Sequence, residues 1–317
     1  MTPQIRSYDD DVIAAAAAII GGGGIVAVPT ETVYGLAADA TNAAAVARIY
    51  AAKGRPAFNP LIVHVADLAA AERIAVFGDD ARALAAAFWP GPLTLVLPVR
   101  AEAGVAALVI AGLDTIAVRV PRHRAMQALL AATGVPLAAP SSNASNGISP
   151  TRAAHVASSL GGRVPLIIDD GACAAGLEST IVAGRTILRP GPITAEQLTR
   201  AFPRGGGGPA STSELYPRLR GGTLIAPGQL ASHYAPSKPL RLDAALANPD
   251  EYLIGFGVIE GDENLSRSAD LAEAATRLFD ALHRADAAPQ PRIATAPIPH
   301  DGIGAAINDR LKRAATR

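Results

Sequence analysis

Side chains that can hold anions or donate hydrogen bonds gather in a few short segments of this sequence. A threonine–glutamate–threonine run occupies residues 30–32, and Lys53 and Arg55 flank a single glycine. A lysine and an arginine at that spacing can hold phosphate oxygens, the arginine as a fork and the lysine as a point charge. Each pattern also has a structural interpretation, because such runs occur in capped turns and basic loops are commonly solvated surface.

Further segments carry side chains of the same kind. Arg119 lies among apolar residues, and a half-buried arginine needs an anionic partner, which a structural carboxylate could supply as well as a substrate. Residues 138–151 combine serines with an expected helix start, an arrangement that suits an anion. Residues 178–191 contain Glu-Ser-Thr and then Arg-Pro-Gly. His64 stands in a β-rich run, where it could bind substrate or be a satisfied core histidine.

The elements that must position these clusters alternate between helices and strands. We expect helices at 12–20, 42–53, 81–89, 124–132 and 151–160, the last begun by Ser149-Pro150, and strands at 25–28, 61–65, 93–99, 115–120, 136–139, 166–168, 179–182 and 186–188. This alternation, with a hairpin at the end, predicts an α/β domain on a mixed sheet. The clusters fall where strands end, the place where open α/β sheets bind ligands, yet the P-loop and Gly-x-Gly-x-x-Gly fingerprints are absent.

The composition changes at the glycine-rich run 203–209, which predicts a linker. Beyond it, strands at 240–242, 252–256 and 293–296 and helices at 271–283 and 305–314 predict a second, smaller α/β unit. We therefore expect a catalytic domain at 1–203, a linker or lid over its active site at 204–238, and a small domain at 239–317. A length of 317 residues also favours two domains over one core.

Composition excludes several classes of protein. Hydrophobic residues make up 50% and charged residues 18%, so the chain is globular, and a formal net charge of zero argues against gripping nucleic acid by charge alone. Cys173 is the single cysteine, which excludes a disulfide framework and a multi-cysteine metal site, and we expect an inert buried thiol. The N-terminus lacks a signal-peptide pattern and the apolar run 12–20 is too short to span a bilayer, so we expect a soluble, cytoplasmic protein.

Taken in order, segments 29–36, 53–56, 59–64, 140–143, 178–180 and 189–191 resemble the motif series of the YrdC-like threonylcarbamoyl-AMP synthases. Segments 233–236 and 309–315 resemble the long, two-domain form of that family. The resemblance implies a YrdC-like twisted mixed sheet with flanking helices and an open groove, plus a small Rossmann-like C-terminal domain. It also implies condensation of L-threonine, bicarbonate or CO2, and ATP into threonylcarbamoyl-AMP and pyrophosphate, for threonylcarbamoyladenosine modification of tRNA.

The resemblance further implies which residues face each substrate. Threonine would face Thr32, His64, Arg119, the backbone at Ala139, and Ser179, with Arg119 taking its carboxylate. ATP would face Arg55, Asn59, Thr115, Ser141, Ser149, Arg189 and Tyr234. Lys53 and Arg55, on an exposed basic loop, would be the catalytic cations, and Tyr234 would close over the groove near Arg55 and Arg189. Mg²⁺ would arrive with ATP without ligands of its own from the protein, and tRNA would be served only through a downstream transferase complex.

Two alternatives remain open at this point. An RNA-binding module could line an α/β groove with Lys53, Arg55, Arg119, Arg122, Arg124 and Arg189, although neutral charge and scarce aromatic residues count against it. A carbamoyltransferase of the same superfamily, as in hydrogenase maturation, would carry acylphosphatase-like and zinc-finger parts, and this sequence has neither.

Overall fold

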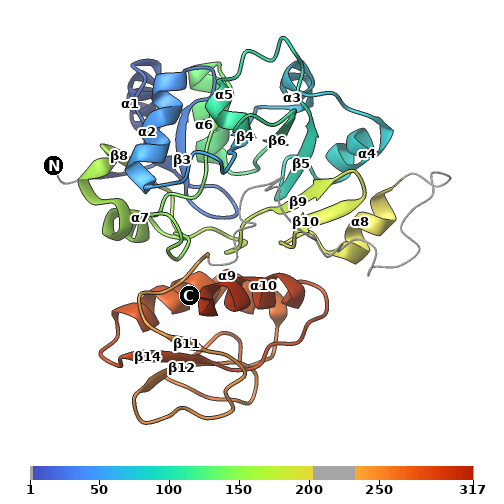
Figure 1. The fold of residues 1–317 in the computed structure, drawn as a ribbon. Helices are drawn as coiled ribbons and strands as arrows, with labels where there is room; N and C mark the ends of the chain where they lie inside the picture. Colours follow the sequence, from blue (N-terminus) through green and yellow to red (C-terminus); the bar gives the residue numbers. More distant parts are fainter. Residues whose placement is uncertain (1–2, 203–232, 317) are drawn as a thin grey trace.

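The structure is a computed structural model that describes residues 3–202 and 233–316. Within these ranges the chain forms two units. In Figure 1 the large unit runs from blue to yellow, and the small unit lies beside it in orange and red. The expected lid over residues 204–238 lies outside the described residues as far as residue 232, and the described chain resumes at His233.

The large unit is built on one mixed sheet. Its strands lie in the order β1-β8-β2-β3-β7-β4-β6-β5-β9-β10. They are β1 (Gln4–Ser7), β2 (Val26–Val28), β3 (Gly35–Asp39), β4 (Ile62–His64), β5 (Leu93–Pro98), β6 (Thr115–Arg119), β7 (Leu137–Ala138), β8 (Leu166–Asp169), β9 (Thr180–Ala183) and β10 (Thr186–Arg189). Pairs such as β4–β6 and β5–β9 are parallel, whereas β5–β6 and the β9–β10 hairpin are antiparallel. The mixed α/β sheet expected from the sequence is confirmed.

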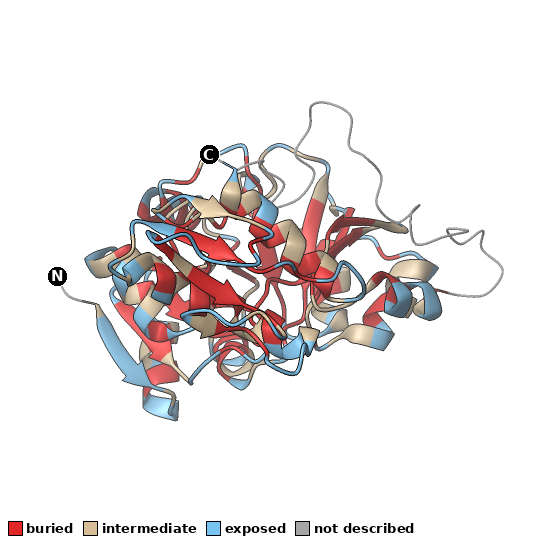
Figure 2. Cartoon of the chain, turned by 90° about the horizontal axis from the view of Figure 1, so that it is seen from below, coloured by how far each residue is buried: buried red, intermediate tan, exposed pale blue. Residues whose placement is uncertain are grey.

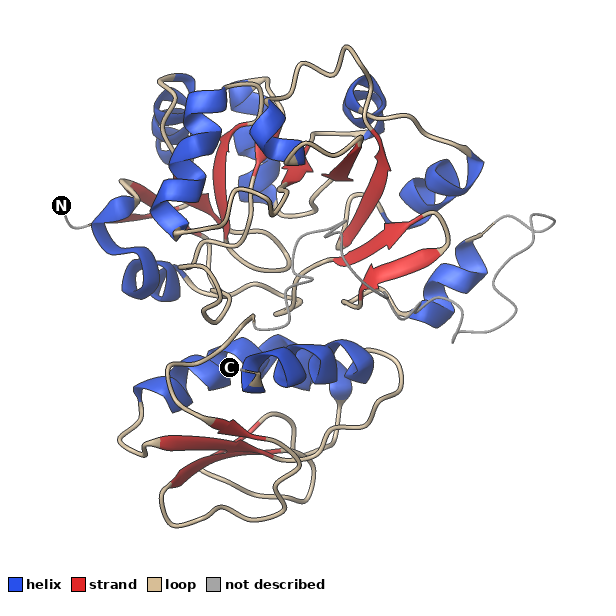
Figure 3. Cartoon of the chain, in the orientation of Figure 1, coloured by secondary structure: helices blue, strands red, loops and turns tan. Residues whose placement is uncertain are grey.

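Helices cover both faces of this sheet (Figure 3). They are α1 (Asp10–Gly21), α2 (Ala43–Lys53), α3 (Leu68–Ile74), α4 (Asp79–Phe88), α5 (Ala107–Ile110), α6 (Arg124–Thr133), α7 (Ala153–Leu160) and α8 (Ala195–Ala201). Successive side chains of a strand point to opposite faces. On β2, Val26 and Val28 therefore join the apolar cluster of α1 and α6, whereas Ala27 joins the cluster of α2 on the other face. Figure 2 shows the resulting concentration of buried residues along the strands.

Helix α2 ends at the basic segment of the sequence. The Asn42 side chain caps its start by accepting hydrogen bonds from two backbone N–H groups. Gly54 ends it in the left-handed conformation, with φ of 60°, which residues with side chains rarely adopt. Lys53 is thus the last residue of a helix, and Arg55 starts the following loop.

The small unit is a parallel sheet whose helices face the large unit. Its strands, in the order β11-β14-β12-β13, are β11 (Leu240–Arg241), β12 (Glu251–Gly255), β13 (Glu263–Asn264) and β14 (Arg292–Thr295). Helices α9 (Leu271–Ala287) and α10 (Gly304–Ala315) lie between the two sheets (Figure 1). Their apolar residues form one cluster with Val33, Ile148 and Leu177 of the large unit, so the two units share a core.

Several elements were not expected from the sequence, namely β1, β3, β13, α3, α5 and α8. The helix expected at 151–160 begins at Ala153, with Arg152 as its N-cap, so Ser149 and Pro150 lie in the preceding loop. Within the described residues, no helix is both long and apolar enough to cross a membrane.

Candidate active site

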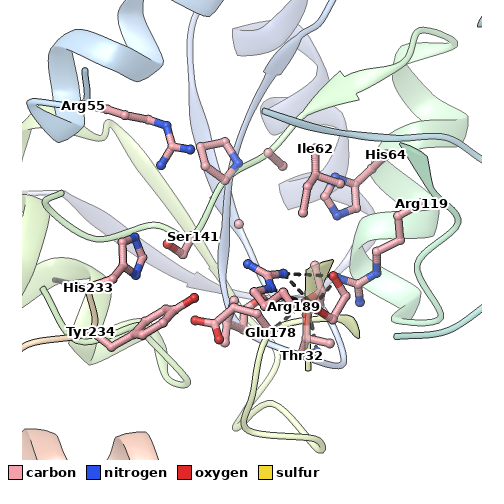
Figure 4. A pocket seen from close by; sticks show the side chains of 16 residues that line it. Thr32, Arg55, Ile62, His64, Arg119, Ser141, Glu178, Arg189, His233 and Tyr234 are labelled. Atoms are coloured by element: carbon pink, nitrogen blue, oxygen red, sulfur yellow. Dashed lines mark hydrogen bonds between the residues drawn. The ribbon is translucent and has the colours of Figure 1, made fainter. Parts of the chain in front are cut away.

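A small cavity, lined by many polar residues, lies where strand ends of the large unit meet the segment that leads into the small unit. Its volume is about 50 Å³, and side chains from distant segments line it: Thr30, Thr32, Val33, Gly35, Arg55, Ile62, His64, Arg119, Ala139, Pro140, Ser141, Glu178, Ser179, Arg189, His233 and Tyr234. Figure 4 shows His233 and Tyr234 on one side of it and His64 and Arg119 on the other. This volume is below the range of about 300–1,000 Å³ that ligand pockets usually measure.

Arg119, at the end of β6, is held by groups of the protein itself. It is 3% exposed, and its Nη2 lies 2.6 Å from Glu31 Oε1. Its Nη1 donates to Thr32 Oγ1 at 2.9 Å and its Nε to the Gly91 carbonyl at 3.2 Å. The anionic partner that the sequence requires is therefore a structural carboxylate. Burial favours a higher pKa for Glu31, but the ion pair with Arg119 and hydrogen bonds outweigh it, and the pKa is lowered.

His64, at the end of β4, lies beside Arg119 in the sheet. It is 2% exposed, and its Nδ1 has no hydrogen-bond partner in the structure. Burial, together with the Arg119 charge, lowers the pKa of His64 to about 3. The ring is therefore neutral near pH 7, and one buried ring nitrogen is unpaired.

Ser179 links the β9–β10 hairpin to the rest of the pocket. Its hydroxyl lies 2.7 Å from Thr94 Oγ1 of β5. Arg189, at the end of β10, donates to the Ser179 carbonyl at 3.0 Å and to its hydroxyl at 3.2 Å. Arg189 is 4% exposed, so the hairpin presents a buried cation to the pocket.

Arg55 reaches the same pocket from the loop after α2. Its Nε donates to the Asn59 carbonyl at 3.2 Å and its Nη2 to the Pro60 carbonyl at 3.0 Å. It is 9% exposed, and burial lowers its pKa to about 10. These two carbonyl contacts orient a guanidinium that remains charged at neutral pH.

Lys53 does not line the pocket, and the expectation that it stands on an exposed loop is wrong. It is 3% exposed, and its Nζ donates to the carbonyls of Ser141 and Asn143, each at 2.6 Å. Burial, with the nearby charge of Arg55, lowers the pKa of Lys53. The side chain ties the end of α2 to the loop that carries Ser141, so its observed contacts are those of a positioning group.

Ser149 also lies outside the pocket lining, but one residue connects it to the pocket. Its hydroxyl donates to Glu178 Oε1, and it is completely buried. Glu178 lines the pocket and precedes Ser179. Ser149 thus contacts the pocket through Glu178.

Asn59 and Thr115 do not line the cavity. Asn59 is 1% exposed, and both its amide Nδ2 and Oδ1 lack a partner. Thr115 begins β6, opposite Pro98, at the far end of the strand from Arg119. The Asn59 carbonyl nevertheless accepts a hydrogen bond from Arg55, another expected ATP contact, whereas Thr115 is not among the residues that line the cavity.

Tyr234 enters the pocket from the segment that precedes the small unit, although it is far from Arg55 and Arg189 in sequence. It is fully buried, with φ of 64°, and its ring packs edge-on against His233 at 4.0 Å and near Phe279 at 5.7 Å. Figure 4 shows its hydroxyl directed toward the middle of the pocket. The ring forms one side of the cavity.

The burial of these cations bears on the RNA-binding alternative. Lys53, Arg55, Arg119 and Arg189 are each at most 9% exposed. An open groove that holds a nucleic-acid backbone needs accessible positive side chains. The basic groove that this alternative requires is therefore not formed by these residues.

Comparisons with known proteins agree with the geometry. Residues 18–191 match the family described as telomere recombination, and residues 193–316 match the threonylcarbamoyl-AMP synthase C-terminal domain. The chain is 39% identical to the threonylcarbamoyl-AMP synthase of Bacillus subtilis, across 92% of this chain and 89% of that protein. It is 37% identical to that of Pyrococcus abyssi, across 92% of this chain and 90% of that protein. The chain belongs to the threonylcarbamoyl-AMP synthase family.

A solved structure supports the same assignment. The crystal structure of P. abyssi Sua5 complexed with L-threonine superposes with a TM-score of 0.88 and 34% identity, and covers 98% of this chain and 97% of that chain. The likeness thus extends over both units, so the long, two-domain form expected from the sequence is confirmed.

Residues that the sequence did not single out also belong to the site. Glu31 and Glu178 lie in segments 29–36 and 178–180, which carry the family resemblance, but the resemblance assigned their carboxylates no role. His233 lines the pocket beside Tyr234. Arg310 contacts Glu178 across 132 positions of sequence, and no local pattern could have revealed that pairing.

Proposed function

We propose that this chain condenses L-threonine, bicarbonate or CO2, and ATP into threonylcarbamoyl-AMP and pyrophosphate. The observation that carries the proposal is the convergence of Thr32, His64, Arg119 and Ser179 with Arg55, Arg189 and Tyr234 on one cavity. The first set carries the hydrogen-bonding groups that an amino acid needs, and the arginines of the second suit a polyphosphate.

The reaction joins two anions. Threonine's amine first forms an N–C bond to the carbon donor, with loss of a proton when the donor is CO2 or of water when it is bicarbonate, and a carbamate results. A carbamate oxygen then bonds to the α-phosphorus of ATP while the bond between that phosphorus and the bridging oxygen breaks, and pyrophosphate leaves. Positioning and charge neutralisation dominate such a step, and no covalent enzyme nucleophile is required.

Arg119 is proposed to hold threonine's carboxylate while it stays paired with Glu31. A guanidinium has five N–H donors, and Arg119 donates hydrogen bonds to the protein through Nε and Nη1, whereas Nη2 is paired with Glu31 by charge and makes no hydrogen bond within the described residues. The remaining N–H groups of the two terminal nitrogens would donate to the carboxylate. Thr32, the neutral His64, Ser179 and the backbone at Ala139 would orient the rest of the amino acid.

Arg55, Arg189, Ser141 and Tyr234 are proposed to hold ATP, with Arg55 as the main catalytic cation. Lys53 would act on the phosphates mainly through the loop that it supports. Asn59, Thr115 and Ser149 remain proposed ATP contacts, although none of the three lines the cavity. Mg²⁺ is proposed to arrive on the ATP phosphates, because oxygens of substrate phosphates are ligands that this ion commonly takes.

The product, threonylcarbamoyl-AMP, indicates a role for this chain in tRNA modification. We propose that threonylcarbamoyl-AMP passes to a downstream transferase that modifies tRNA, and that this chain works in the cytoplasm without a membrane. The proposed division remains a catalytic domain at 1–203, a linker at 204–238 that covers the site, and a small domain at 239–317.

The test is pyrophosphate release from ATP and bicarbonate with and without L-threonine. Release should depend on threonine, and Arg119→Gln should abolish it, whereas Arg82→Gln, at an exposed ion pair, should not. Release that is equal without threonine would contradict the proposal.

A further inference from the structure

One arginine of the small unit is buried beneath the cavity of the large unit. Arg310 of α10 is 0% exposed and donates hydrogen bonds to three residues. Its Nε donates to Glu178 Oε2 at 2.7 Å, its Nη2 to the Pro190 carbonyl at 2.9 Å, and its Nη1 to Asp309 Oδ2 at 2.6 Å. A fully buried guanidinium with this many matched acceptors is rigidly placed.

The Arg310 contacts join two loops that carry pocket residues. Glu178 stands just before β9, next to Ser179, and Pro190 just after β10, next to Arg189. These loops already touch, since a side chain at Gly191 would come within 2.5 Å of the Thr180 nitrogen. Arg310 therefore connects the residue before the β9–β10 hairpin with the residue after it.

The contact with Glu178 extends to a further site residue. Glu178 Oε1 accepts from the buried Ser149 hydroxyl while Oε2 accepts from Arg310. Burial would raise the pKa of Glu178, but the charges of Arg310 and Arg189 and the Ser149 hydrogen bond outweigh it and lower the pKa. The carboxylate thus stays ionised because Arg310 is present.

Arg310 also supports the aromatic wall of the cavity. Its guanidinium carbon lies 5.0 Å from the centroid of the Tyr234 ring, in cation–π contact. Arg310 therefore contacts Tyr234 on one side of the proposed ATP subsite, and through Glu178 and Pro190 it supports the hairpin that carries Arg189.

We propose that Arg310 is a positioning residue of the active site, through which the small domain fixes Glu178, the β9–β10 hairpin and Tyr234 for ATP binding and adenylyl transfer. This inference rests on the proposed function. It gives the small domain a specific role, because the ATP subsite of this chain is then complete only when α10 is docked.

The experiment compares Arg310→Lys with Arg152→Lys in the full-length chain. Lysine keeps the charge but cannot reach Glu178 and the Pro190 carbonyl together or present a planar face to Tyr234. Arg152 is the matched control, because it also pairs across the domains, with both oxygens of Asp280, but lies at the surface. We expect Arg310→Lys to lower kcat/KM for ATP by tenfold or more, with a smaller change in KM for threonine, and Arg152→Lys to change neither by more than about twofold.

A pH profile separates positioning from simple loss of stability. The groups that face Glu178 are Arg310, Arg189, the Ser149 hydroxyl and Tyr234. Without the hydrogen bond from Arg310 Nε, burial of Glu178 is less well offset and its pKa rises, so Arg310→Lys should lose activity at a higher pH than wild type as the solution is acidified. Arg152→Lys should follow the wild-type profile.

A double variant covers the case in which a single change prevents folding. Glu178→Gln/Arg310→Gln removes both buried charges together, which costs far less stability than leaving one unpaired. It should fold and still lose ATP turnover. Wild-type kinetics and pH profile in Arg310→Lys, or losses equal to those of Arg152→Lys, would overturn the inference.

Failure of the proposed function is distinguishable. A wild type that releases no pyrophosphate would contradict the function, and the inference would then be decided by ATP binding. In that case ATP should raise the Tm of wild type and of Arg152→Lys but not of Arg310→Lys, and an equal rise in all three would overturn it.

Discussion

Replacing Lys53 by methionine tests whether this lysine positions the site from within the protein. The substitution keeps an unbranched side chain that is one atom shorter, and it removes the Nζ that donates to the Ser141 and Asn143 carbonyls, each at 2.6 Å. A buried carbonyl left unpaired costs about 1–3 kcal/mol. Two such groups would cost about 2–6 kcal/mol. Part of this cost is offset because the variant no longer buries a charge, so we expect the free energy of unfolding to fall by about 2–4 kcal/mol.

The assay is a thermal melt followed by circular dichroism. For a domain of this size each kcal/mol lowers Tm by about 2–4 °C, so Lys53→Met should melt about 4–16 °C below wild type. Lys238 is the control, because its Nζ also donates to two carbonyls, those of Ala285 and Ala288, but it is only half-buried. Water can replace its bonds, so Lys238→Met should shift Tm by about 2 °C or less.

Activity completes the test. We expect Lys53→Met to lose turnover, because the loop that carries Ser141 is no longer fixed. A variant with wild-type Tm and no turnover would refute this reasoning and would favour direct contact between Lys53 and phosphate.

Three further outcomes are expected. Valine should support far less pyrophosphate release than threonine, with serine intermediate, because a site that hydrogen-bonds a hydroxyl rejects an isostere lacking it; equal turnover with valine would be contrary to this. Arg55→Lys should lower kcat/KM for ATP by about 10- to 100-fold, since a charge-assisted contact of about 1.5–3 kcal/mol is weakened, and the Arg73→Lys control, at a helix end outside the cavity, should not. The pKa of His64 is about 3 in the folded protein and 6.5 in the unfolded chain, so the unfolded chain binds a proton more readily. The folded state therefore loses stability as the pH drops below 6.5. His64→Gln should recover about 2 kcal/mol of that loss at about pH 5 in urea unfolding, and an equal loss in both proteins would show that His64 is protonated in the fold.

Much of the fold could be predicted because the periodic segments were long enough to identify. The strand at residues 25–28 and the helix at 42–53 were placed within a residue or two, since capping and burial leave local traces such as Asn42 and Gly54. The strand β3 (Gly35–Asp39) could not be predicted, because its sequence, Gly-Leu-Ala-Ala-Asp, has little β-branched character and is held by pairing with β2 and β7.

Part of the site could likewise be predicted from the sequence, and part could not. The resemblance led to Arg55, Arg119 and Arg189, all of which line the cavity. It could not show that Lys53 turns inward onto two carbonyls, because exposure depends on tertiary packing. Nor could it show that Arg310 reaches Glu178, since that contact joins two domains.

The central claim is that this chain makes threonylcarbamoyl-AMP from three small molecules. The most direct measurement is mass spectrometry of the nucleotides formed from ATP, L-threonine and ¹³C-bicarbonate. We expect an AMP adduct that contains threonine and carries the label, formed in equal amount to pyrophosphate. Pyrophosphate released with unmodified AMP, or an adduct that lacks the label, would contradict the claim.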